Sequence, residues 1–175
     1  MSGIMYLMRK RFNHASLIMI YYSLVYSHIC YCIAIWGSTW SCHLKPVIIA
    51  QKRFIRTISF ANRYDPSLPL FIECKLLRID YIFKYFSALI IFKFLNNGYC
   101  NELFTLAPNA YALRHNVNNI IVPFYRTSRG QRSLLYTAPL IWNNLPTHLK
   151  TLSNINTFKF QFKRHLLQLQ SNEMN

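Results

Sequence analysis

The chain has 175 residues, of which 53% are hydrophobic and 16% aromatic, and this composition excludes an intrinsically disordered chain. Twenty Lys and Arg residues against five Asp and Glu residues give a formal charge of +15. The charge indicates a polyanionic partner, either nucleic acid or an anionic membrane surface. A basic surface without a partner stays open, because net charge does not specify one.

Five cysteines stand at positions 30, 32, 42, 74 and 100, an odd number without the spacing of a disulfide framework. This pattern is typical of free thiols in a reducing compartment. The residues Arg9-Lys10-Arg11 precede an apolar run, but that run continues beyond the length of a secretory signal peptide. We therefore expect an intracellular protein, nuclear or cytoplasmic.

The first predicted element is a long apolar helix over residues 14–35. No Lys, Arg, Asp or Glu stands between Arg11 and Lys45, and Asn13 and Gly37 are suitable residues to begin and end the helix. The length also fits a membrane span of about 20 apolar residues. The many Tyr, Ser and His side chains are a heavy polar load for a bilayer core. A membrane-associated protein anchored by residues 12–44 is therefore an alternative.

The next predicted helix, over residues 44–60, has an apolar side and a basic row. The apolar side carries Val47, Ile48, Gln51, Phe54, Ile55 and Ile58. Lys45, Lys52 and Arg56 fall within a narrow arc on the other side, with a reach suited to phosphates rather than bases. The row indicates either a nucleic-acid contact or an ordinary solvated face.

Residues 62–69 predict a connector, because proline restrains the residue before it from helix, and a short helix is expected over residues 70–77. A long helix is predicted over residues 80–97, with Asp80 as its N-cap and Gly98 as its stop. Apolar side chains surround this helix almost completely, which predicts that it is central in the core.

The chain becomes irregular and Asn-rich over residues 99–119, which predicts a helical body over residues 1–98 and a small extension over residues 120–175. Within the extension, residues 120–122 and 133–136 predict two short strands of a β-hairpin. A short helix over residues 139–144 and a final helix with Ser153 or Asn154 as its N-cap follow, and one face of the final helix carries Phe158, Phe162, His165, Leu166 and Leu169. The predicted fold class is mainly α with this small hairpin or irregular tail.

A second basic cluster is formed by Arg126, Arg129 and Arg132, spaced by three, with Tyr125 beside them. Arginine pairs with phosphate in bidentate fashion or stacks on a base, so the cluster is a candidate grip for a single strand. A flexible basic hairpin tip is the alternative.

Catalytic residues are not expected. Two-metal polymerase chemistry needs carboxylates that converge on metal ions about 4 Å apart. The acids stand singly, at positions 65, 73, 80, 102 and 173, and no two aspartates are adjacent. Cys30 and Cys32 are one residue apart, and the remaining Cys and His residues show no zinc-site spacing. We expect no enzyme activity, no metal and no cofactor.

Seven short motifs follow one another in a fixed order along the chain. They are Tyr21-Tyr22-Ser23-Leu24-Val25-Tyr26, Tyr31-Cys32 followed by Trp36-Gly37, Gln51-Lys52-Arg53, Pro69-Leu70-Phe71, Arg126-Thr127, Tyr136 leading to Ile141-Trp142-Asn143-Asn144-Leu145-Pro146, and Phe158-Lys159. Over about residues 13–169 this order resembles the segment downstream of the palm in reverse transcriptases of non-long-terminal-repeat retrotransposons, jockey-like elements in particular. The palm, which carries the polymerase chemistry, has no counterpart in the chain.

The resemblance implies a helical thumb-like bundle with a C-terminal extension, which in the family holds the RNA or RNA–DNA duplex leaving the palm. Gln51, Lys52 and Arg53 match the basic thumb helix of the family. A structural role is implied for the motif residues Tyr26, Trp36, Gly37, Trp142, Asn143, Leu145 and Pro146. The expected function is non-catalytic, sequence-independent binding of nucleic-acid backbone through Lys45, Lys52, Arg53, Arg56, Arg126, Arg129 and Arg132. An inert transposon relic is the further alternative.

Overall fold

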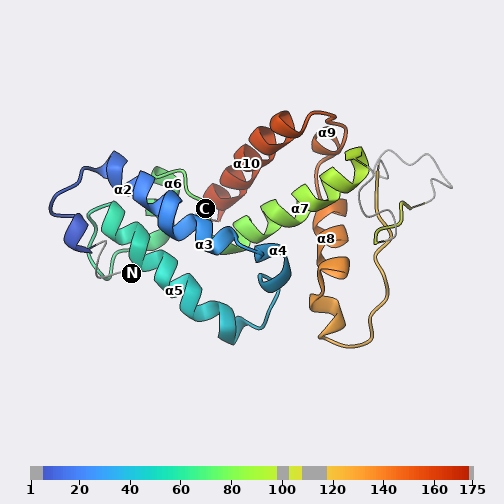
Figure 1. Cartoon of the computed structure of the whole chain (residues 1–175), viewed down its shortest axis with the longest axis horizontal. Helices are drawn as coiled ribbons and strands as arrows, with labels where there is room; N and C mark the ends of the chain where they lie inside the picture. Colours follow the sequence, from blue (N-terminus) through green and yellow to red (C-terminus); the bar gives the residue numbers. More distant parts are fainter. Residues whose placement is uncertain (1–5, 98–102, 108–117, 174–175) are drawn as a thin grey trace. The chain divides into compact units, whose positions relative to one another are not determined.

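The computed structural model describes residues 6–97, 103–107 and 118–173, and these residues are mainly helical. The longer helices are α5 (Ser41–Ile58), α7 (Ile79–Asn97), α8 (Leu134–Asn143) and α10 (Ile155–Asn172), and Figure 1 shows their course. The shorter ones are α2 (His14–Ile20), α3 (Ser27–Cys30), α4 (Ile33–Trp36), α6 (Ser67–Glu73) and α9 (Thr147–Lys150), with a π-helical turn η1 (Tyr21–Tyr26) and a 3₁₀ turn η2 (Gly130–Arg132). The predicted mainly α class is confirmed.

The chain forms two compact units, each assembled from separate stretches. Unit 1 comprises Met1–Ile33, Thr39–Ile82 and Leu167–Asn175, and unit 2 comprises Ala34–Ser38 and Phe83–Leu166. The irregular connector predicted over residues 99–119 falls largely outside the described residues.

The first helical stretch of unit 1 begins as predicted and ends early. Asn13 is its N-cap, since the Asn13 side chain accepts a hydrogen bond from the Ser16 amide at 2.9 Å. Helices α2, η1 and α3 follow one another without a break as far as Cys30. The prediction of one continuous helix over residues 14–35 is therefore wrong beyond Cys30. Tyr31 is extended and Cys32 has a φ of 51°, so α4 starts as a separate turn. Among the described helices, none has the length and apolarity needed to cross a bilayer.

Helix α5 packs beside α2 and α6 in unit 1 (Figure 1). It spans Ser41–Ile58, three residues earlier at its start than predicted. It ends in a Schellman motif, because the Ala61 amide donates to the Arg56 carbonyl at 3.0 Å and the Phe60 amide to the Thr57 carbonyl at 3.4 Å. Phe60 therefore takes a φ of 55°, a conformation that costs a non-glycine residue about 1–2 kcal/mol.

Helix α6 also differs from its predicted bounds. It spans Ser67–Glu73 instead of 70–77, because Pro69 lies in its first turn, where a missing N–H leaves no hydrogen bond unmade. Lys75, with a φ of 53°, ends it in a second Schellman motif.

Two buried glutamines hold the segment between α6 and α7 in unit 1. The Gln51 side chain of α5 donates to the Leu77 carbonyl and accepts from the Ile79 amide, both at 3.0 Å. The Gln170 side chain of α10 donates to the Leu76 carbonyl and accepts from the Arg78 amide, also at 3.0 Å. Because Gln51 and Gln170 are 2% and 0% exposed, these bonds satisfy backbone groups shielded from water.

Asp80 is the second residue of α7, so its predicted role as N-cap is wrong. Its carboxylate pairs with the Arg78 guanidinium at 3.0 Å, and Arg78 also pairs with Glu173. Gly98, the predicted stop of this helix, lies outside the described residues.

The Tyr81 hydroxyl donates to Glu173 at 2.6 Å, and burial together with this bond raises the pKa of Tyr81 to about 12.

The stability of the protein is expected to fall between pH 10 and pH 12. Burial raises the pKa of Tyr21 from 10.0 to about 12, against a smaller opposite effect of its bond from Gln51. The unfolded chain therefore loses this proton first, and the stabilisation, complete below pH 10, is lost as pH rises to 12. At about 1.4 kcal/mol per pKa unit the loss is roughly 2–3 kcal/mol. Urea unfolding at pH 9.5 and 11.5 measures this loss of unfolding free energy. Tyr21→Phe should remove the part of the loss that is due to Tyr21 and leave the part that is due to Tyr81. If the variant kept the full pH dependence of the wild type, the prediction would be contradicted.

Aromatic side chains form the core of unit 2. The Phe92 ring of α7 stacks on the Phe158 ring of α10 at 4.3 Å, and Phe162 stacks on Phe158 at 5.4 Å. The Trp142 ring of α8 lies 5.9 Å from Phe158. The predicted cap Asn154 is confirmed, since its side chain accepts from the Asn156 amide at 2.8 Å.

The predicted β-hairpin in unit 2 is wrong. Residues 134–136 open α8, and Ser133 precedes it as the N-cap residue, so the helix predicted over 139–144 begins five residues earlier. Within the described part of the chain, β pairing is limited to an isolated bridge between Leu106 and Ile120. The four residues 133–136 are too few for apolar periodicity to separate a strand from a buried helical turn.

Candidate nucleic-acid interface

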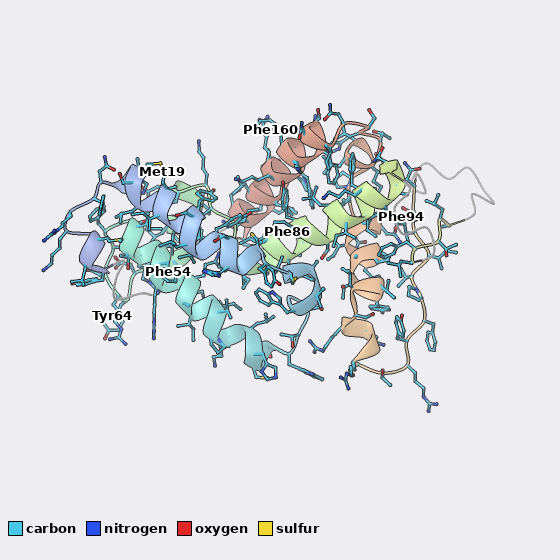
Figure 2. The ribbon with its side chains drawn as sticks, in the orientation of Figure 1. Met19, Phe54, Tyr64, Phe86, Phe94 and Phe160 are labelled. Carbon is cyan, nitrogen blue, oxygen red and sulfur yellow. The ribbon has the colours of Figure 1, made fainter. Side chains whose placement is uncertain are left out.

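The predicted basic residues of α5 lie beside its buried face in unit 1. Phe54, labelled in Figure 2, is buried together with Ile55 and Ile58, so the helix presents its basic side outward. Lys45 and Arg53 are exposed, and Lys52 and Arg56 are half-buried.

Arg53 and Arg56 line a hollow at the end of α5, whose volume is about 530 Å³. Its lining residues are Tyr6, Arg9, Arg53, Arg56, Thr57, Ala61, Asn62 and Arg63. Four of them are arginines, and among the described residues no carboxylate lines the hollow. We call this feature the arginine hollow. It does not include Lys45 or Lys52, so the structure brings together only two of the four basic residues predicted on α5.

Two arginines of the hollow are held in place by unit 1 itself. The Arg56 Nε donates to the Asp65 carbonyl at 2.8 Å. The Arg9 guanidinium lies over the Phe60 ring, 5.0 Å from its centroid, a cation–π contact worth about 0.5–1 kcal/mol at an exposed site. The left-handed backbone at Phe60 thus supports the position of Arg9.

Few carboxylates are available to neutralise the arginine hollow. Asp80 and Glu173 pair with Arg78, away from the residues that line the hollow. The Asp65 carboxylate accepts from the Asn62 amide at 2.6 Å and so helps to shape the connector after α5. The hollow is consequently a concentration of positive charge that favours an anion.

Sequence reasoning missed Arg9, Arg63 and Tyr6. Arg9 belongs to a basic run before an apolar segment, and Arg63 lies in a predicted connector. The excess of basic residues pointed to an anion partner, but helical periodicity cannot relate residues of different segments.

The second predicted cluster, in unit 2, is divided by the structure. Arg126 and Arg129 are exposed. Arg132 donates from its guanidinium to the Ser38 carbonyl at 3.1 Å, and the Ser38 hydroxyl donates back to the Arg132 carbonyl. Arg132 therefore stabilises the turn after α4. Of the three predicted arginines, only Arg126 and Arg129 are exposed enough to contact a ligand.

The turn that carries this cluster requires a glycine. A β-carbon at Gly130 would lie 2.8 Å from the Tyr125 side chain, closer than real contacts allow. The Tyr125 ring in turn meets the Tyr136 ring of α8 edge-on at 6.2 Å.

The segment 118–120 is held in place within unit 2 by the motif that contains Trp142 and Asn143. Trp142 is fully buried and donates from Nε1 to the Asn118 carbonyl at 2.8 Å. The Asn143 side chain bonds both the amide and the carbonyl of Ile120, at 3.0 and 2.8 Å. The Leu145 amide donates to the Trp142 carbonyl at 3.0 Å, and Pro146 is the N-cap residue of α9. These contacts are structural in character, and the Trp142 ring is not exposed to a ligand.

Lys150 completes this arrangement. Its ammonium donates to the Asn143 carbonyl at 2.7 Å and to Asn119 Oδ1 at 2.9 Å, and it is 4% exposed. Burial lowers the pKa of Lys150. This lysine is therefore part of the core of unit 2 and does not contribute to a basic surface.

The other motif residues occupy the N-terminal helices. Tyr26 packs against Tyr22 with ring centroids 5.2 Å apart in unit 1. Trp36 and Gly37 are half-buried and stand at the end of α4 in unit 2.

Metal-binding and thiol chemistry find little support. Among the residues that the structure describes, no group of three His, Cys, Asp or Glu side chains could hold a metal ion. Burial raises the pKa of the Cys30 thiol to about 11 and also raises that of Cys74. Raised pKa values keep these two thiols protonated and weakly nucleophilic.

No family model, no curated protein and no solved structure matches the chain. The functional assignment therefore depends on the geometry described above and on the order of the sequence motifs.

Proposed function

We propose that the chain is a non-catalytic segment of a retrotransposon RNA-directed DNA polymerase, and that it binds the backbone of RNA or of an RNA–DNA duplex without sequence preference. The arginine hollow is the observation that carries the proposal, because four arginines line it with no lining carboxylate in the described part of the chain. Lys45 and Lys52 extend the positive charge along α5.

The chemistry of these residues favours phosphate over base recognition. Guanidinium groups pair with phosphate oxygens in bidentate fashion, and such contacts position a nucleic acid without reading its sequence. Arg126 and Arg129 of unit 2 supply further exposed positive charge. Affinity should therefore depend on salt far more than on sequence.

Charge reversal of α5 tests this function. The triple variant Lys52→Glu, Arg53→Glu, Arg56→Glu is expected to make the slope of log affinity against log salt about 2–3 units shallower, because at least three phosphate contacts are lost. Fluorescence anisotropy with a labelled 20-base-pair RNA–DNA duplex between 50 and 300 mM NaCl measures the slope.

A matched control variant separates the effect of the α5 site on the salt slope from the effect of net charge. Lys93→Glu, Lys159→Glu, Arg164→Glu changes the total charge by the same amount on α7 and α10 of unit 2, and it should leave the slope nearly unchanged. Equal slopes for the wild type and the α5 variant would remove α5 as the binding face. Equal losses in both triple variants would show that net charge alone is responsible.

A further inference from the structure

We propose that the arginine hollow binds the terminal phosphate of a nucleic-acid strand whose last base is unpaired. The inference rests on the proposed function and specifies the ligand of the same site. It is carried by the charge and shape of the hollow and by the aromatic side chains around it.

Charge favours a terminal phosphate over a phosphate within a strand. A phosphodiester carries one negative charge, whereas a phosphate monoester carries about 1.5 to 2 at pH 7 and has three oxygens that accept hydrogen bonds. Four arginines line the hollow. Because each guanidinium can donate two parallel bonds to a phosphate, the donors of the hollow exceed what one diester can accept.

The shape of the hollow also favours a terminal phosphate. The hollow is a concave volume of about 530 Å³ formed by the connector after α5 and by residues ahead of α2. A phosphate inside a strand enters a concavity only together with both of its neighbours, whereas a terminal phosphate enters with one. Lys45 and Lys52 lie outside the hollow on α5, where they can contact the backbone that follows the terminal phosphate.

The site is partly organised before any ligand binds. The Asp65 carbonyl holds the Arg56 Nε, which leaves the two terminal amino groups of Arg56 to a ligand. The Phe60 ring holds the Arg9 guanidinium, although Phe60 occupies a left-handed position that favours glycine.

Aromatic rings around the hollow favour a strand end over a free phosphate or a lipid headgroup. Tyr6 lines the hollow and is 57% exposed, and Phe60 is 46% exposed. Tyr64 follows the lining residue Arg63, is 90% exposed, and projects from the connector in Figure 2. Stacking on exposed aromatic rings is how proteins hold unpaired bases without reading their sequence.

The test compares strand ends that differ in one phosphate. Fluorescence anisotropy at 150 mM NaCl and pH 7.5 would use a single-stranded 12-nucleotide oligouridine with either a 5′-phosphate or a 5′-hydroxyl, labelled at its 3′ end. The phosphorylated strand is expected to bind at least about tenfold more tightly, since charge-assisted bonds are added. The preference should shrink below pH 6, because the second ionisation of the phosphate is then lost.

Two double variants locate the preference. Arg53→Ala, Arg63→Ala should abolish the preference for the phosphorylated end, and both side chains are exposed, so folding is preserved. Lys45→Ala, Lys52→Ala lies outside the hollow and should weaken binding of both strands by the same factor. Thermal unfolding of each variant verifies that it is folded. The comparison of the two strand ends with the wild-type protein does not depend on the variants.

The outcomes separate this inference from the proposed function. Equal affinity for both ends, with a steep salt dependence, would overturn the terminal-phosphate site and leave backbone binding in place. A failure to bind either strand or the duplex would overturn both. Binding to phosphatidylcholine vesicles containing 10% phosphatidic acid, not displaced by the phosphorylated strand, would overturn the assignment to a nucleic-acid end.

Discussion

Replacing Gln51 with leucine is expected to lower the free energy of unfolding by about 4 kcal/mol, a large share of the 5–15 kcal/mol typical of a folded domain. Leucine has a similar volume but leaves three polar partners without their bond, namely the Tyr21 hydroxyl, the Leu77 carbonyl and the Ile79 amide. Each buried polar group left unsatisfied costs about 1–3 kcal/mol. Urea unfolding followed by circular dichroism at pH 7.5 measures the change.

The matched control is the same substitution at an exposed glutamine. Gln168 of α10 is exposed, so Gln168→Leu should change the free energy of unfolding by less than about 0.5 kcal/mol. Comparable effects of the two substitutions would mean that the bonds of Gln51 contribute little to the stability of unit 1.

The substitution Trp142→Ala is expected to cost about 3–5 kcal/mol through the loss of a large buried side chain. Trp142 packs against Phe158 and bonds the Asn118 carbonyl, so its removal should also release the segment 118–120. Thermal unfolding measures the first effect. Faster hydrogen exchange at the Ile120 amide, which donates to Asn143 Oδ1, measures the second.

The variant Trp142→Phe separates packing from hydrogen bonding. Phenylalanine keeps most of the aromatic contact with Phe158 but cannot donate to the Asn118 carbonyl, so a cost of roughly 1–2 kcal/mol is expected. If Trp142→Ala left both the melting temperature and the exchange of Ile120 unchanged, the motif would not hold this segment.

Helices and their caps were predictable where a local signal was strong. The side chains of Asn13 and Asn154 accept hydrogen bonds from the first turns of α2 and α10 as expected, because capping depends on only a few neighbouring residues. Helical spacing correctly predicted that Phe158, Phe162 and Leu166 of α10 are buried, but Leu169, predicted on the same face, is 40% exposed. Gln51 lay on the predicted apolar side of α5, but its bonding partners belong to other segments and could not be predicted.

The breaks in the fold were harder to predict. No glycine or proline marks the end of α3, and the left-handed Cys32 is unfavourable locally, so packing within the folded chain determines the turn. The same holds for Phe60 and Lys75, which occupy positions that sequence rules reserve for glycine.

The candidate site was predictable only within a single helix. Helical periodicity indicated Arg56 and the family resemblance added Arg53 on the same predicted helix. Arg9 and Arg63 reach the hollow from segments of no regular period. Arg132 shared a spacing of three with Arg126 and Arg129, but that spacing defines a face only in a regular helix. Its neighbour Ser38, far away in sequence, decides its role.

The Gln170 bonds to Leu76 and Arg78 have a consequence for synthesis. Unit 1 needs Leu167–Asn175, which the ribosome makes only after Phe83–Leu166 of unit 2. At about 5–20 residues per second, roughly 5–20 seconds separate the two halves of this contact during translation. Until Gln170 has been made, the segment between α6 and α7 lacks the two bonds that this side chain supplies. A nascent chain stalled within unit 2 would therefore expose an unfinished unit 1 to chaperones and proteases.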